Sequence, residues 1–289
     1  MKTILLPLLD DDSDTAELLS EAALATAHLI AERFTGHIEG FFVRDLPLRG
    51  ASSLDVIPEY FAQHNDYWDR ARQKTHNHFI AYMARHDIPV QGMNAAAEGL
   101  TAHWTDAEGD RPEVVGSFGR LFDVIVIPRA VSDSAESNLQ TCEGALFESG
   151  RPVMLAPPNT PKNIGRNVVI AWNGSLETAR TIGLGMPFLK QAEVVTVLSV
   201  QGARGGMVPG PSGDQVAAQL VRHGFNATAR TVPAHGRSSG VTVLEETASL
   251  GADLLFKGAY SHHRLREIVF GGTTRHVLNE AKLPVLIAH

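Results

Sequence analysis

The chain is poor in the features that mark secreted, membrane-spanning or nucleic-acid-binding proteins. Its 289 residues include a single cysteine, Cys142, so no disulfide can form within the chain. No apolar run approaches the roughly 20 residues that a membrane-spanning helix needs. The formal charge is -7, which argues against the broad basic face of a nucleic-acid-binding protein. We therefore expect a cytoplasmic globular protein with neither membrane nor nucleic-acid partners.

Two enzyme motifs are also missing. There is no Gly-x-x-x-x-Gly-Lys-(Ser/Thr) sequence, so the lysine that P-loop nucleotide hydrolases place on the phosphates is absent. The chain has 13 histidines but no His-Glu-x-x-His pattern, and the adjacent His262 and His263 have no nearby triad of carboxylates or cysteines. The sequence therefore predicts no resident metal, and no enzymatic activity beyond, at most, slow nucleotide hydrolysis.

What the chain does contain is an internal repeat of strand-like blocks in the same order. The matched blocks are 2–10 with 167–175, 37–43 with 192–200, 122–130 with 251–259, and 150–157 with 282–289. Between the halves, residues 157–165 carry three prolines, which disfavour both helix and strand. We therefore predict a first domain at 1–156, a linker at 157–165 and a second domain at 166–289.

Each half alternates short apolar runs with segments of helical periodicity, of which 14–34 is an example. Strands that are apolar on both faces and alternate with helices are typical of a parallel sheet covered on both sides. Five strands per half, joined by right-handed crossovers, predict two tandem doubly wound α/β domains with the strand order 3-2-1-4-5. Such sheets bind ligands at the carboxyl ends of the strands where the order reverses. In the second half these ends are 172–174 and 257–259.

The stretch that follows the fourth strand of the second half, KGAYSHHRLREIVFGGTT (257–274), has the chemistry of a phosphate site. Its glycines allow close approach of the backbone, and a helix beginning near Gly272 would offer free N–H groups and the positive end of its dipole. Thr273 or Thr274 would supply a hydroxyl group, and the histidines and arginines a local positive field. The alternative is a plain connector, because a strand-to-helix turn also needs glycines and a capping residue.

This stretch and the last strand, PVLIAH, resemble the universal stress protein family, and the repeat makes the chain similar to a tandem two-domain member. The resemblance is strongest from 253 to 289. The family's Gly-x2-Gly-x9-Gly-(Ser/Thr) loop falls on Gly258, Ser261, Gly271 and Gly272. Two of the four motif positions therefore differ in this chain.

The resemblance implies a stress-linked regulatory protein that binds an adenine nucleotide, such as ATP, in its second half, with Mg²⁺ or Mn²⁺ as the accompanying ion. Asn173 stands where the family has an acidic residue, and Val200 where it has a hydrophobic contact with adenine. The expected nucleotide-binding residues are Trp172, Asn173, Val200, Gly258, Ser261, His262, Arg264, Gly271, Gly272, Thr273 and Thr274.

The resemblance also implies a lesser role for the first half. Pro128 and Ala130 stand where the glycine loop would begin, so this half is a degenerate partner that lacks the phosphate site. Members of the family pair the last strands of two domains, which here implies intramolecular pairing of the two halves. A homodimer of whole chains stays open.

Two other functions compete with this interpretation. One is a structural or protein-interaction module that binds no nucleotide. The other is a serine hydrolase, because GRSSG at 236–240 matches the Gly-x-Ser-x-Gly nucleophile elbow and Asp253 and His262 follow in the required order. Against the hydrolase, the repeat places this turn after the third strand, at the sheet edge, where Ser238 or Ser239 would cap the next helix.

Overall fold

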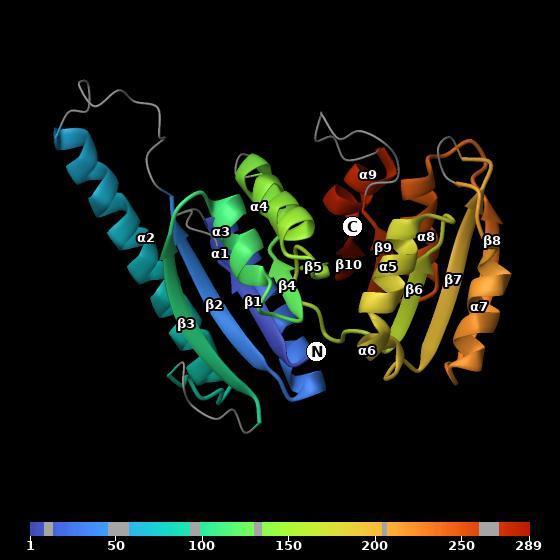
Figure 1. The fold of residues 1–289 in the computed structure, drawn as a ribbon, viewed down its shortest axis with the longest axis horizontal. Coiled ribbons are helices and arrows are strands. Elements are labelled where there is room, and N and C mark those ends of the chain that lie inside the picture. The colour runs from blue at the N-terminus through green and yellow to red at the C-terminus, as the bar shows by residue number, and fades with distance from the viewer. Residues whose placement is uncertain (9–13, 46–57, 93–98, 130–134, 204–206, 260–271) are drawn as a thin grey trace. The chain divides into compact units, whose positions relative to one another are not determined.

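The protein folds into two compact α/β units, Met1–Ser149 and Gly150–His289, each built on its own set of parallel strands (Figure 1). The computed structural model describes residues 1–8, 14–45, 58–92, 99–129, 135–203, 207–259 and 272–289. None of the helices in these ranges has both the length and the hydropathy needed to cross a membrane.

The first unit holds four parallel strands in the order β3-β2-β1-β4. These are β1 (Thr3–Pro7), β2 (His37–Arg44), β3 (Thr101–Glu108) and β4 (Val124–Ile127). The helices are α1 (Asp14–Phe34), α2 (Pro58–Arg85), α3 (Arg111–Gly119) and α4 (Ala135–Glu148). Residues 4–7 of β1 and the whole of β4 are apolar and buried, as is typical of parallel strands in a sheet that helices cover on both faces.

A buried polar network joins β2 to β3 in this unit. Glu39 accepts hydrogen bonds from His103 Nδ1 (2.8 Å) and Thr105 Oγ1 (2.6 Å), and its other oxygen lies 3.4 Å from His37 Nε2. Burial opposes ionisation of this carboxyl, but the hydrogen bonds from His37, Thr105 and His103 outweigh it and hold the pKa of Glu39 below its usual value. The network therefore contains a stable buried carboxylate.

The second unit holds five parallel strands in the order β10-β9-β6-β7-β8. These are β6 (Asn167–Ala171), β7 (Val194–Gln201), β8 (Ala227–Pro233), β9 (Leu254–Gly258) and β10 (Val285–Ala288). The helices are α5 (Leu176–Leu184), α6 (Met186–Leu189), α7 (Gly213–Arg222), α8 (Ser239–Ser249) and α9 (Gly272–Glu280). With right-handed crossovers, α5 and α7 cover one face of the sheet and α8 and α9 the other.

The expected α/β class and the strand order 3-2-1-4-5 are confirmed, with one addition. The fifth strand expected in the first half forms as β5 (Val153–Leu155), but it lies in the second unit, antiparallel to β10, with Val153 opposite Ile287. Because of this pairing the units divide after Ser149, and the proline-rich segment 157–165 lies inside the second unit. β5 thereby covers the apolar edge of β10, which would otherwise invite association with another strand.

Candidate functional site

The carboxyl edge of β6 and β9 is the point where the strand order of the second unit reverses. After β6 the chain turns through Trp172–Ser175 into α5, on one face, and after β9 it leads through Gly258 and Ala259 towards α9, on the other face. The two connections diverge from neighbouring strands, which is the arrangement that opens a ligand crevice in doubly wound sheets. The described residues of the expected site at 172–174 and 257–259 therefore lie at the topological switch point of the second unit.

The turn after β6 uses its polar side chains to begin α5. Asn173 Oδ1 accepts hydrogen bonds from the backbone N–H of Ser175 (3.2 Å) and from Thr178 Oγ1 (2.9 Å). Ser175 is the N-cap residue of α5, and its hydroxyl accepts the N–H of Thr178. The amide oxygen of Asn173 thus has a structural role, and its NH₂ group is the part of this side chain left to a ligand.

A second segment, 207–211, packs against this turn. Val208 N donates to Asn173 O (2.8 Å), and the indole N–H of Trp172 donates to Pro211 O (2.8 Å). Gly174 has a φ of 84°, and a Cβ there would lie 2.5 Å from Val208 O. Position 174 therefore requires glycine, both for its positive φ and for its close approach to Val208 O. Residues 207–211 cover this side of the turn.

Gly258, the first glycine of the expected loop, has a packing role of its own. A Cβ at this position would lie 2.5 Å from the backbone nitrogen of Thr178 and 2.8 Å from the carbonyl carbon of Glu177. The end of β9 therefore approaches the first turn of α5 closely enough that only glycine fits. This close packing is sufficient to explain why position 258 is glycine, without any contact to a ligand. It also brings the end of β9 close to the first turn of α5.

A buried lysine lies directly beside this glycine. Lys257 Nζ donates to Gly258 O and to Thr274 Oγ1, each at 3.0 Å, and only 8% of the residue is exposed. Burial lowers the pKa of Lys257 to about 8, although the Glu177 carboxylate acts in the opposite direction. Since Thr274 is in the first turn of α9, the contact ties that helix to β9 and places a positive charge beneath its amino end.

The other expected site residues fall into three groups. Val200 is buried near the end of β7. Gly272 and Thr273 are the first two residues of α9, in the same turn as Thr274. Ser261, His262, Arg264 and Gly271 lie outside the described residues. Sequence reasoning did not assign a role to Lys257, although a lone lysine in the apolar run LLFKG was a signal that it is buried and paired.

The geometry gives the serine hydrolase no support. Ser238 is the N-cap residue of α8, and its hydroxyl accepts the N–H of Val241, as the capping alternative predicts. Asp253 precedes β9, at the amino edge of the sheet, and accepts the backbone N–H groups of Arg166 and Asn167. Ser238 follows β8, at the opposite edge, so this serine and this aspartate cannot belong to one catalytic triad.

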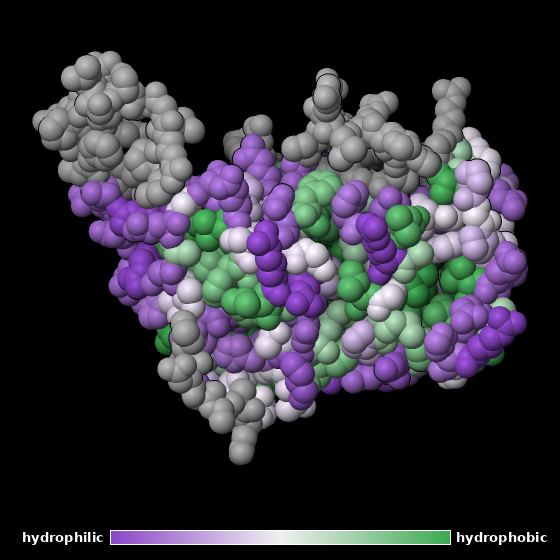
Figure 2. Space-filling view, in the orientation of Figure 1, coloured by the Kyte–Doolittle hydropathy of each residue, from purple (hydrophilic) through white to green (hydrophobic). Residues whose placement is uncertain are grey.

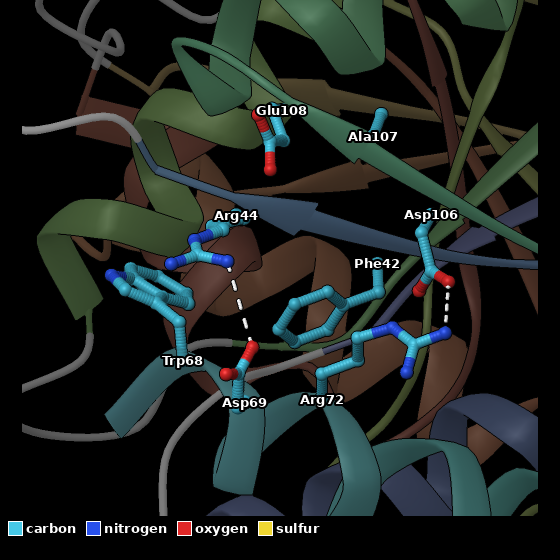
Figure 3. A pocket seen from close by; sticks show the side chains of 8 residues that line it. All are labelled: Phe42, Arg44, Trp68, Asp69, Arg72, Asp106, Ala107 and Glu108. Atoms are coloured by element: carbon cyan, nitrogen blue, oxygen red, sulfur yellow. Dashed lines mark hydrogen bonds and ion pairs between the residues drawn. The ribbon is translucent and has the colours of Figure 1, made fainter. Parts of the chain in front are cut away.

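The first unit carries a charged pocket of about 470 Å³ at the carboxyl ends of β2 and β3, next to α2 (Figure 3). Its lining residues are Phe42, Arg44, Trp68, Asp69, Arg72, Asp106, Ala107 and Glu108. Arg44 pairs with Asp69 (3.5 Å) and Arg72 with Asp106 (2.5 Å). Both arginines therefore face carboxylates, and the pocket lacks the single-sign field that would attract a free anion.

Metal ligation finds no support in the parts of the chain that the structure describes. No three side chains among the described histidines, cysteines, aspartates and glutamates are grouped so that they could hold an ion. The buried Glu39 network, which brings two histidines to one carboxylate, is instead saturated by its own hydrogen bonds.

Together, these features define a doubly wound α/β domain whose strand order reverses between β6 and β9. Residues 166–289 match the model of the Universal stress protein family. The second unit therefore contains a universal stress protein domain, as the sequence predicts.

Solved structures extend the likeness in fold to both units. A universal stress protein from Archaeoglobus fulgidus DSM 4304 superposes with a TM-score of 0.64 and 14% identity, covering 99% of this chain and 97% of that one. A functionally unknown protein from Pseudomonas aeruginosa PAO1 gives a TM-score of 0.53 and 15% identity, covering 100% and 92%. No curated protein sequence matches the chain.

Proposed function

We propose that this protein is a stress-linked regulator whose second unit binds an adenine nucleotide, such as ATP with Mg²⁺ or Mn²⁺, at the carboxyl edge of β6 and β9. The universal stress protein domain of the second unit supports the stress-linked role. The observation that carries the nucleotide proposal is the buried contact between Lys257 and Thr274, which lies beside Gly258 at the amino end of α9.

This contact favours an anionic ligand for an electrostatic reason. A lysine whose pKa is about 8 is still mostly protonated at neutral pH, so the first turn of α9 rests on a positive charge. The free N–H groups of that turn and the helix dipole act in the same direction. A phosphate group bound there would interact with the Lys257 charge, the N–H groups and the helix dipole at the same time. Each attraction is weak, so appreciable affinity requires all of them together.

The proposal divides the ligand between the two sides of the crevice. The phosphates lie at Gly258 and the first turn of α9, formed by Gly272, Thr273 and Thr274. The base and sugar lie at the turn after β6, where the NH₂ group of Asn173 is available, and near Val200. Binding regulates the protein's conformation or contacts, and nucleotide turnover is not part of the proposal.

Titration calorimetry of the whole chain with ATP, in the presence of Mg²⁺, tests this proposal. Thr274→Val keeps the shape of the side chain but removes the hydroxyl that Lys257 contacts, and should weaken ATP binding about tenfold. The matched control is Thr247→Val, because Thr247 is also buried and bonds only to Val243 O within α8. No binding at millimolar ATP, or equal affinity of both variants and the parent, would contradict the proposal.

One observation favours the second candidate, a protein-interaction module without nucleotide. The amide oxygen of Asn173 is already bonded to Ser175 and Thr178, and the segment 207–211 packs on the same turn. Mass spectrometry of the natively purified chain separates the two candidates. A co-purifying adenine nucleotide supports the first, and its absence together with no ATP binding supports the second.

A further inference from the structure

An apolar groove of about 700 Å³ runs between α5 and α7 on the second unit, away from the amino end of α9. Hydrophobic residues gather between these two helices in Figure 2. The lining residues are Trp172, Ala179, Ile182, Gly183, Met186, Pro211, Gln215, Val216, Ala218, Gln219, Leu220, Arg222 and His223. A volume of this size suits a small-molecule ligand rather than a few solvent molecules.

The two helices give the groove a direction. Both begin at the carboxyl edge of the sheet, so Trp172 and Pro211 lie at one end of the groove. Met186 and Arg222, which come at the ends of the two connections, lie at the other. α7 has 10 residues, so the groove beside it is about 15 Å long. An extended ligand would fit it better than a compact one.

The walls of the groove are apolar and accessible. Ile182, Met186 and Val216 are half-buried, and Ala179 is exposed on the same side of α5. The side chain of Trp172 is buried, with its indole N–H already bonded to Pro211 O, so the ring contributes an apolar surface. An apolar chain laid along these residues would remove them from water.

The charge on the groove is one-sided. None of the lining residues is acidic, in a chain whose formal charge is -7. Arg222 and His223 lie together at the end remote from Trp172, and Arg222 Nη1 donates to Gln219 Oε1 (3.1 Å). That single bond leaves most of the guanidinium donors of Arg222 available to a carboxylate.

We propose that this groove binds an amphipathic carboxylate of the fatty-acid type, with its chain between α5 and α7 and its carboxylate at Arg222. An apolar groove with one arginine at its end matches a ligand that has an apolar chain and a single terminal carboxylate. A neutral lipid would leave Arg222 without a partner, and a polyanion would not use the apolar walls. The proposal does not rest on nucleotide binding, because the described residues of α9 take no part in the groove, and Trp172 is the one expected nucleotide-binding residue that also lines it.

Trp172 provides the readout, since it is one of three tryptophans and lies at the end of the groove opposite Arg222. Dodecanoate that carries bromine on its terminal carbon should quench Trp172 fluorescence strongly, because that carbon lies near the indole. The same acid brominated next to its carboxylate should quench less. Trp172→Phe removes the difference. Equal quenching by the two probes would overturn the proposed orientation.

Two variants test the site itself. Ala179→Glu places a carboxylate in the groove from an exposed position and should abolish dodecanoate binding. Arg222→Gln should weaken it about tenfold, whereas Lys190→Gln, which removes an exposed charge outside the groove, should leave it unchanged. Dodecanol should bind the parent about as weakly as dodecanoate binds Arg222→Gln.

Three results would overturn the proposal. They are equal binding of dodecanol and dodecanoate, unchanged binding by Ala179→Glu, and chain dimerisation that Ala179→Glu prevents. The last result would identify a second copy as the occupant of the groove. Arg222→Gln, at the end of the groove remote from Trp172, should leave ATP affinity unaltered, and this arm of the experiment keeps the two proposals separable, since either can fail alone.

Discussion

The two units differ at two pairs of corresponding positions near the carboxyl edge of each set of strands. Counted from Asp123 and Asp253, which precede β4 and β9, Lys257 of the second unit corresponds to Ile127 of the first. Counted back from the Pro-Val pairs that begin β5 and β10, Thr274 corresponds to Cys142. A buried lysine and threonine in one unit thus replace a buried isoleucine and cysteine in the other.

Burial shifts the pKa of one group in each unit, Cys142 in the first and Lys257 in the second, but with opposite consequences for charge. Burial raises the pKa of the Cys142 thiol to about 12, so this group stays neutral, and burial lowers the pKa of Lys257 to about 8. At neutral pH only the second unit holds a charge at these two positions, although the first unit buries Arg129 two residues after Ile127. An anion near the last helix is therefore favoured in the second unit and has no matching partner in Ile127 and Cys142.

The two units make the same contacts at the amino ends of their strands. Asp123 accepts the backbone N–H groups of Lys2 and Thr3, and Asp253 those of Arg166 and Asn167. Each contact ties the strand that follows the aspartate to the first strand of its unit. The units thus share these contacts at the amino edge of the sheet and differ at Lys257 and Thr274, near the edge where doubly wound sheets bind ligands.

The largest expected effect concerns Gly258, whose counterpart in the first unit, Pro128, has a Cβ. Gly258→Ala should destabilise the second unit by about 2 to 3 kcal/mol, because the new methyl group meets the backbone of Thr178. Urea unfolding followed by Trp172 fluorescence measures this change.

Gly183→Ala is the matched control for Gly258→Ala. A Cβ on Gly183 meets nothing within 4 Å, and alanine is the better helix former by about 0.5 to 1 kcal/mol. We expect this variant to be as stable as the parent or more so. If both variants have the same stability, the close packing of β9 on α5 is not a constraint that sets the second unit apart.

The two aspartates should give the next largest effect, and an equal one. Asp123→Ala and Asp253→Ala each leave two backbone N–H groups without their acceptor, at a cost of about 1 to 2 kcal/mol. Each substitution should lower the unfolding midpoint of its own unit only, as followed by hydrogen exchange of β1 or β6 amides. A much smaller loss of stability for one variant would mean that the two aspartates, although they make the same hydrogen bonds, do not stabilise their units equally.

Sequence patterns predicted most of this architecture for a simple physical reason. Blocks such as VIVI and VLIA are apolar throughout, and a parallel sheet covered on both faces buries them completely. The pairing of β5 with β10 was expected from the family resemblance, but its antiparallel register could not be predicted, because the register depends on contacts far apart in the chain. The polar turn after β6 was found by position, but the bonds of Asn173 to Ser175 and Thr178 follow from local geometry that a motif does not encode.

The role of Gly258 shows a limit of motif reasoning. A glycine in a phosphate-loop pattern suggests contact with a ligand, yet the approach of α5 accounts for it as well. Conversely, Lys257 precedes the motif and received no role, although it holds the buried charge of the site. Burial and pairing of a single side chain depend on neighbours from other elements, here Thr274, and these are not visible along the sequence.

A smaller effect is expected at Glu39, whose place in the second unit is taken by the buried Thr196 according to the pairing of β1 with β2 and β6 with β7. Glu39→Gln should cost the first unit about 1 kcal/mol at pH 7, because hydrogen bonds to a charged acceptor are replaced by weaker ones.

The pH dependence of this effect has a definite sign. The pKa of Glu39 is lowered on folding, so its contribution to stability is present above the usual value of 4.5 and is lost as the pH falls through the lower, folded value. Glu39→Gln should therefore reduce the loss of first-unit stability on acidification, as measured by urea unfolding at a series of pH values. The second unit should show no such change, and an effect there would contradict the assignment.

The smallest effect on stability, and the most direct test of the comparison, comes from giving the second unit the residues of the first. In Lys257→Ile with Thr274→Cys, the lost hydrogen bonds are offset by the removal of a buried charge, so stability at pH 7 should change by less than about 1 kcal/mol.

The folded pKa of Lys257, about 8, lies below its usual 10.5, so between these values the unfolded chain binds more protons. The free energy of unfolding of the parent should therefore rise across this interval, whereas the double variant should lack the rise and Thr274→Cys alone should keep it. A rise that persists without Lys257 would assign the titration to another group, and would remove the buried charge as the feature that distinguishes the second unit.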